Sequence, residues 1–255
     1  MTLKRFLLLL TLLAMTTVAC AETDQQLPAP IQALKSRGIQ VVGPFQTPGG
    51  VTGYAGFANQ QPVAMYLTAD GEHVIVGAML DAQGNPVNQD TVEDMIAEPM
   101  TKRVWGQLEN STWVADGQDD AKHTFYVFSD PNCPYCHLFW ERIRPWVNNG
   151  TVQLRHVLVG IIGEDSPNKA AAILTADNPE QAFVENEQRF SNGGITPQQD
   201  IPEKTHGQLM TNLMLMRQFG LRGTPGIAYR DDQGHVQFWR GVPKKEEIIK
   251  VLGQS

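Results

Sequence analysis

Cysteine is scarce in this chain of 255 residues, which has three. One lies near the N-terminus, and the other two form the motif Cys133-Pro134-Tyr135-Cys136. A structural zinc site takes about four ligands, usually from two pairs of cysteine or histidine, and the sequence has no second pair. A structural disulfide across this motif would close a very short loop and stabilise little, because the stabilisation grows with loop length. Neither structural role fits the motif.

Two other signatures are also missing. The formal charge is −7, and it would become −9 if Lys4 and Arg5 were removed with an N-terminal leader. An acidic chain without a block of basic residues has no electrostatic footprint for nucleic acid or anionic lipid. Gly50, Gly53 and Gly56 lack the spacing of a dinucleotide-binding loop, and no helical segment follows them. No nucleic acid, cofactor or metal is therefore predicted.

No apolar run at the N-terminus is long enough to cross a membrane. The apolar residues 6–13 follow a basic start and precede Ala19-Cys20-Ala21, and they fall well short of the roughly 20 residues that a spanning helix needs. The pattern predicts a secretory signal peptide, residues 1–21. Lipidation of Cys20 is the alternative, but Thr17 stands where a lipoprotein site usually has leucine. Export would take the remaining cysteine pair to a compartment where disulfides persist.

What the sequence does contain is a cysteine pair between a strand and a helix. Residues 123–128 form an apolar run that predicts a buried strand, and residues 138–147 predict a helix. A strand that leads into Cys-x-x-Cys at a helix start is typical of a thioredoxin-like redox site. The free N–H groups and the helix dipole there favour a thiolate at Cys133. We expect Cys133 to attack and Cys136, one turn further on, to resolve the product.

The pattern along the chain predicts two units joined by a helix. Residues 22–87 combine a short helix with four strands, at 39–45, 51–58, 63–67 and 74–80. Residues 88–111 predict a linker helix, with a new turn or a kink at Pro99. Residues 112–255 alternate strands at 152–159, 227–230 and 236–240 with helices at 168–175, 179–188, 207–219 and 244–252. The apolar stripe in 207–219, with Met210 and Met214, predicts core rather than a groove.

Thr224-Pro225 stands directly before the first strand of the C-terminal hairpin. In thioredoxin-like folds this position is a cis-proline that lies against the reactive cysteine. Because proline has no N–H, residue 224 can offer its own backbone groups to an incoming peptide as an added strand. Thr224 and Pro225 are therefore predicted to hold the client, and Pro134 and Tyr135 to tune the thiolate.

Residues 128–136 (Phe-Ser-Asp-Pro-Asn-Cys-Pro-Tyr-Cys), with Thr224-Pro225 and the small N-terminal unit, resemble the DsbC/DsbG family of periplasmic thiol:disulfide interchange proteins. The resemblance covers the whole chain after residue 21, and the lack of a further cysteine pair is similar to the DsbG branch. It implies an α+β N-terminal dimerisation domain (22–87), a linker helix (88–111) and an α/β thioredoxin-like domain with a helical insertion (112–255). It also implies a periplasmic V-shaped homodimer and a DsbD-like membrane reductase that keeps Cys133 and Cys136 reduced.

The resemblance implies a disulfide isomerase or reductase that acts on periplasmic client proteins with cysteines, including sulfenylated ones, and that also serves as a chaperone. The alternatives are a DsbA-like oxidase and a holdase with secondary redox activity. One departure from thioredoxin is Val127, which stands where thioredoxin has an acidic residue, six positions before the first cysteine. Proton transfer at Cys136 then needs another group. His137, next to Cys136, could add positive charge to the site, but a residue on an exposed first turn is more often solvated, and that is the prediction.

Overall fold

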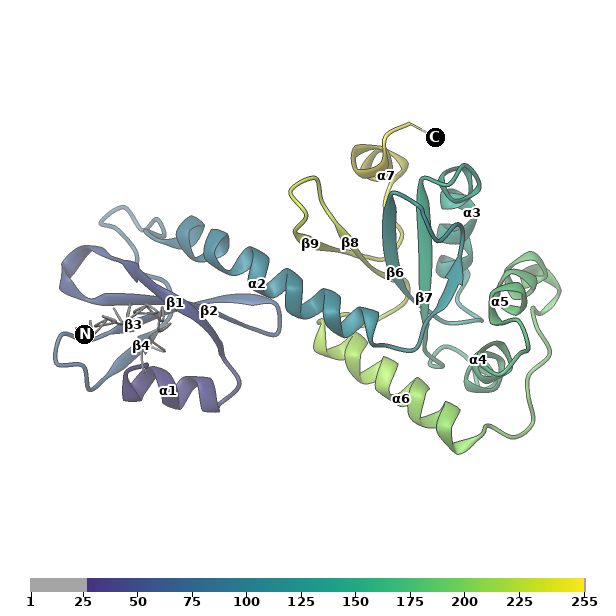
Figure 1. Ribbon diagram of the computed structural model, residues 1–255, viewed down its shortest axis with the longest axis horizontal. Coiled ribbons are helices and arrows are strands. Elements are labelled where there is room, and N and C mark those ends of the chain that lie inside the picture. Colours follow the sequence, from purple (N-terminus) through teal and green to yellow (C-terminus); the bar gives the residue numbers. More distant parts are fainter. Residues whose placement is uncertain (1–26, 255) are drawn as a thin grey trace, which may run out of the picture.

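The computed structural model describes residues 27–254. The predicted signal peptide, with Cys20, lies outside the described residues. Within residues 27–254, no helix is both long and apolar enough to cross a membrane. Two sheets stand side by side, and a single long helix, α2, runs between them (Figure 1).

The first sheet is antiparallel throughout, in the order β1-β2-β3-β4. Its elements are α1 (Ala29–Ser36), β1 (Gln40–Gln46), the 3-10 turn η1 (Pro48–Gly50), β2 (Thr52–Ala58), β3 (Gln61–Leu67) and β4 (Val74–Val76). Successive side chains of a strand point to opposite faces. Tyr54 therefore packs with Ile31 of α1, whereas Ala55 packs with Val92 and Ile96 of α2. The two helices cover opposite faces of the sheet.

The outer strand β4 is shorter than the predicted strand at 74–80. It ends at Val76, and Gly77 follows with a φ of 152°. Leu80 makes only an isolated bridge to Pro86. Ile75 and Val76 are left 60% and 50% exposed at this edge of the sheet.

Helix α2 (Gln89–Glu109) belongs to both cores. Its first half packs on the N-terminal sheet, and its second half places Val104 and Leu108 in the core of the C-terminal sheet. Pro99 lies inside one continuous helix, between the two packed halves. The predicted unit boundaries at 87/88 and 111/112 fall close to the two ends of this helix.

The second sheet has the order β5-β7-β6-β8-β9, with β6 parallel to β7 and the other neighbours antiparallel. Its elements are β5 (Val114–Asp116), β6 (His123–Ser129), α3 (Pro134–Asn148), β7 (Val152–Leu158), α4 (Ser166–Leu174), α5 (Pro179–Gln188), the 3-10 turn η2 (Phe190–Asn192), α6 (Glu203–Gln218), β8 (Gly226–Arg230), β9 (Val236–Arg240) and α7 (Lys245–Leu252). The helices α4, α5 and α6 are inserted between β7 and β8.

The side chains of the central strand β6 point alternately to the two faces of the sheet and pack in the cores on both sides. Phe125 and Val127 point to the face covered by α3 and α7, and Tyr126 and Phe128 point to the face covered by α6 and the end of α2. All four side chains are at most 1% exposed. The strand that leads to the cysteine motif is therefore fixed from both sides.

Three sequence predictions differ from the structure here. The edge strand β5 was not predicted, since three residues carry too little pattern. Helix α6 begins at Glu203 instead of residue 207, and the acidic residue in its first turn suits the helix dipole. Met210 and Met214 are 44% and 66% exposed, so the prediction that they belong to the core is wrong. They lie one turn apart on the outer face of α6, while Leu209 and Met216 pack inward.

Candidate redox site

The cysteine motif lies at the first turn of α3. Cys133 is the residue that caps this helix, in an extended conformation, and Pro134 occupies the first helical position, where no N–H is needed. The Cys133 sulfur accepts a hydrogen bond from the backbone N–H of Cys136 at 3.2 Å. The sulfur therefore takes the place of the oxygen of an ordinary N-cap side chain.

The loop before Cys133 is held by a buried carboxylate. Asp130 is 1% exposed and accepts hydrogen bonds from the backbone N–H groups of Ile161 (2.6 Å), Ile162 (3.0 Å) and Asn132 (2.9 Å). These bonds tie the loop after β7 to the residue next to Cys133. A satisfied buried network of this kind fixes the position of the attacking sulfur.

The opposite wall is the loop before β8. The Thr224–Pro225 peptide bond is cis, and the Cys133 thiol lies 3.4 Å from the carbonyl oxygen of Thr224, to which it donates. The Thr224 hydroxyl oxygen is buried and has no hydrogen-bond partner within residues 27–254. The structure thus brings together Cys133, Cys136, Thr224 and Pro225, while the Tyr135 side chain is 64% exposed beside them.

The two cysteines have opposite acid–base properties. The pKa of Cys133 falls from 9.0 to about 6, because the neighbouring Cys136 thiol, the nearby Thr224 side chain and the first backbone N–H groups of α3 favour the thiolate and outweigh the effect of burial. The pKa of Cys136 is raised well above 9.0 by burial and then by the neighbouring Cys133. At neutral pH, Cys133 is therefore a thiolate and Cys136 a thiol.

Alkylation of the reduced protein should follow this assignment. We expect the rate of reaction of Cys133 with iodoacetamide to have its midpoint near pH 6, as its pKa of about 6 requires. In Cys136→Ala the midpoint should rise, because the main side-chain donor to the Cys133 sulfur is lost. The same cysteine in the urea-unfolded chain is the control. A native midpoint equal to that of the unfolded chain would contradict the assignment.

The prediction that His137 is solvated is wrong. Its side chain is 20% exposed, and its ring stacks on Phe190 with the centroids 4.5 Å apart and lies near Trp140. Its Nδ1 atom is 3.0 Å from the Glu187 carboxylate. Helix α5 and the turn after it cover this first turn of α3, which a pattern within α3 alone does not indicate.

Glu187 is the residue that sequence reasoning missed. Its side chain is 2% exposed, and burial raises its pKa from 4.5 to about 7, against the opposing effect of His137. The negative charge of Cys133 raises it further, which shows that the two groups interact. Val127 itself lies in the core, 1% exposed. The acidic group near the cysteines thus comes from the helical insertion, 50 residues after His137, and no local motif marks it.

Disulfide exchange needs a thiolate to attack and a second thiol close enough to resolve the adduct. Cys133, with its lowered pKa, and Cys136, one turn away, have the properties that this chemistry needs, and the Cys133 sulfur lies against the loop before β8. The class of protein is therefore a thiol–disulfide oxidoreductase.

Comparisons with known proteins agree with this class. A family model described as a thioredoxin-like domain matches residues 114–255. The chain is 41% identical over 241 residues to the thiol:disulfide interchange protein DsbG of Pseudomonas aeruginosa, covering 94% of each. It is 37% identical over 253 residues to the DsbG of Escherichia coli K12, covering 99% of this chain and 100% of that one. The solved catalytic domain of Proteus mirabilis ScsC, at 21% identity, has a TM-score of 0.50 and covers 60% of this chain and 95% of its own, which shows the fold.

The chain belongs to the DsbG branch of the DsbC/DsbG family of thiol:disulfide interchange proteins. The predicted thioredoxin-like α/β domain with a helical insertion is confirmed. The predicted thiol–disulfide oxidoreductase activity is confirmed at the level of the family.

Proposed function

We propose that the protein reduces or isomerises wrong disulfides in exported client proteins, with Cys133 as the attacking residue and Cys136 as the resolving residue. The observation that carries this proposal is the contrast between the two sulfurs. Cys133 ionises near pH 6, whereas its neighbour stays protonated in the same buried site. The Cys133 thiolate, which is present at neutral pH, would attack the client, and the Cys136 thiol would act in the second step.

The steps are as follows. The Cys133 thiolate attacks one sulfur of a client disulfide, a mixed disulfide forms, and the other client sulfur leaves as a thiolate. In isomerisation, another client thiolate attacks the client sulfur and releases Cys133. In reduction, Cys136 loses its proton and attacks the Cys133 sulfur, so that the client receives two electrons and a Cys133–Cys136 disulfide forms. A sulfenylated client cysteine enters the same scheme, with water as the leaving group after protonation.

The residues around the sulfur have supporting roles in this proposal. Thr224 and Pro225 would hold the client backbone, and the Thr224 hydroxyl, which lacks a partner, would donate to the thiolate. Pro134 and Tyr135 would tune the first turn of α3, and the exposed Tyr135 would contact the client.

The proposed site of action is the periplasm, after removal of residues 1–21, with a DsbD-like membrane reductase that returns the cysteines to the dithiol. Acid quenching of cells followed by thiol alkylation reports the redox state of Cys133 and Cys136 in the exported protein. We expect mostly the dithiol. A mostly oxidised pair would instead favour the DsbA-like oxidase.

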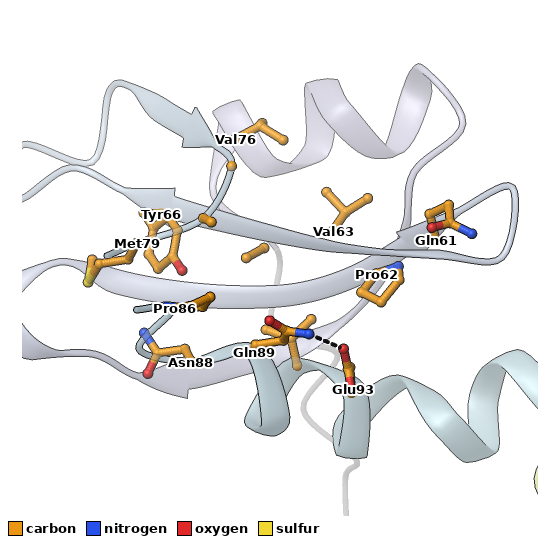
Figure 2. A pocket seen from close by; sticks show the side chains of 14 residues that line it. Gln61, Pro62, Val63, Tyr66, Val76, Met79, Pro86, Asn88, Gln89 and Glu93 are labelled. Carbon is orange, nitrogen blue, oxygen red and sulfur yellow. Dashed lines mark hydrogen bonds between the residues drawn. The ribbon is translucent and has the colours of Figure 1, made fainter. Parts of the chain in front are cut away.

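We also propose that residues 22–87 make the protein a homodimer. The edge strand β4 is short and exposes Ile75 and Val76, and no other strand within residues 27–254 pairs with its outer side. Next to it, a hollow of about 450 Å³ lies between β3, the segment after β4 and the start of α2 (Figure 2). Tyr66, Met79 and Val92 are among its lining residues. The N-terminal unit is small, and its exposed apolar edge strand and the hollow beside it could be covered by the same unit of a second copy.

Sedimentation equilibrium tests the dimer. The mature chain should have twice the monomer mass at micromolar concentration. In Ile75→Lys/Val76→Lys the dimer should dissociate, because two charges on the edge strand oppose pairing. The matched control is Lys substitution at Met210 and Met214, which are exposed on α6 in the other unit. A monomeric mature chain would contradict the proposal.

A further inference from the structure

A cavity of about 520 Å³ lies beside the loop that faces the attacking sulfur. The loop before β8 and the end of β9 form its walls, and Gly241 N–H donates to the Pro225 carbonyl at 2.9 Å to close one side. The lining residues are Gly220, Leu221, Arg222, Gly223, Thr224, Pro225, Arg240 and Gly241. Thr224 belongs both to this cavity and to the contact with Cys133.

The charged side chains on the lining are two arginines, Arg222 and Arg240, and no acidic residue lines the cavity. Both arginines are exposed. Within residues 27–254, neither takes part in a salt bridge. Arg222 and Arg240 thus line a cavity that includes Thr224, the residue whose carbonyl contacts Cys133, in a chain whose formal charge is −7.

Several other arginines of this domain have structural partners. Arg144 pairs with Asp116, Arg189 pairs with Glu185, and Arg230 lies over the ring of Trp105. Among residues 27–254, Arg222 and Arg240 make no ion pair, side-chain hydrogen bond or ring contact of this kind. A guanidinium group matches a carboxylate with two parallel hydrogen bonds, which makes it a selective receptor for that group.

We propose that this cavity is a client subsite for a carboxylate, the side chain of an Asp or Glu one or two residues from the client cysteine. The inference rests on the proposed function. In the mixed disulfide the client sulfur is bonded to Cys133, next to the Thr224 carbonyl. A client strand that continues along this loop advances about 3.3 Å per residue. Its next side chains therefore reach the cavity with Arg222 and Arg240.

The test uses peptides whose single cysteine is linked to a 2-pyridyl group by a disulfide. The neutral pyridine-2-thione that leaves is followed by its ultraviolet absorbance. Three peptides differ only in the residues that flank the cysteine, which are Glu, Gln or Lys. The reduced mature protein should react about tenfold faster with the Glu peptide than with the Gln peptide, and slowest with the Lys peptide. Added salt should narrow the differences, because the arginines are exposed.

The variant Arg222→Gln/Arg240→Gln should lose the preference for Glu while it keeps the rate with the Gln peptide. The matched control is Arg217→Gln, an exposed arginine on α6 that does not line the cavity, and it should keep the preference. Equal rates for Glu and Gln peptides with the unsubstituted protein, or an unchanged preference in the double variant, would overturn the inference. So would a loss of rate with the Gln peptide in the double variant, which would mean that the arginines serve the thiolate. If the unsubstituted protein does not react with the Gln peptide, the proposed function itself fails.

Discussion

Cys136→Ser should turn the protein into a trap that holds its clients as mixed disulfides, and Cys133→Ser should trap none. In the unsubstituted protein the Cys136 sulfur lies within one helical turn of the adduct, so the second step is intramolecular and fast. Serine cannot attack a disulfide. The adduct should then persist for minutes to hours, the time range of uncatalysed disulfide rearrangement.

The experiment is non-reducing electrophoresis of periplasmic extract after acid quenching, with the trapped partners released by a reductant. Because Cys136→Ser replaces the S–H donor to the Cys133 sulfur by an O–H donor, the reaction with a purified disulfide client is best run at about pH 8, where Cys133 is ionised in both proteins. The double variant Cys133→Ser/Cys136→Ser is the control for non-covalent capture. Equal trapping by both single variants, or trapping by Cys133→Ser alone, would reverse the proposed roles.

These roles could be predicted from the sequence because their signals are local. Cys133 and Cys136 lie at a strand-to-helix boundary that hydrophobic periodicity marks clearly. Pro225 was placed opposite them only because it precedes the C-terminal hairpin, a position that the resemblance to a known fold made meaningful. The alternating faces of the strand at 123–129 likewise follow from a period of two.

The surroundings of the site could not be predicted in this way. His137 and Glu187 are 50 residues apart, and only the packing of α5 on the first turn of α3 brings them together. The same limit applies to Met210 and Met214. Helical periodicity identifies an apolar stripe, but it does not tell which part of the stripe another element covers.

Glu187→Gln should make the reduced protein more stable at pH 8 and leave it nearly unchanged at pH 4.5. The carboxyl of Glu187 is buried, and its pKa is raised from 4.5 to about 7. Between these two pH values the folded chain keeps a proton that the unfolded chain has released. The free energy of unfolding therefore falls by about 1.4 kcal/mol for each pH unit between these values. This contribution is fully present below pH 4.5 and is lost as pH rises through 7, about 3 kcal/mol in all.

Glutamine keeps the shape of the side chain and an oxygen that can accept from His137 Nδ1, but it carries no charge to bury. Thermal melting of both proteins from pH 4.5 to 8 should show a difference that grows with pH. The control is Glu185→Gln on the same helix, an exposed carboxylate paired with Arg189, which should show almost no difference. Equal melting temperatures of Glu187→Gln and the unsubstituted protein at pH 8 would mean that Glu187 is solvated.

The same substitution should also change the active sulfur. Because the Cys133 thiolate raises the pKa of Glu187, an ionised Glu187 must raise the pKa of Cys133 in return. At the Cys133 midpoint near pH 6, Glu187 is mostly protonated, so its replacement should leave the alkylation midpoint nearly in place. Above pH 7, where Glu187 ionises, replacement by Gln removes a negative charge that opposes the thiolate. A more stable thiolate favours the dithiol over the disulfide, so the variant should be a stronger oxidant, with a more positive potential against glutathione. A Glu187 that only packs against His137 would move the melting curve and leave the potential at pH 8 in place.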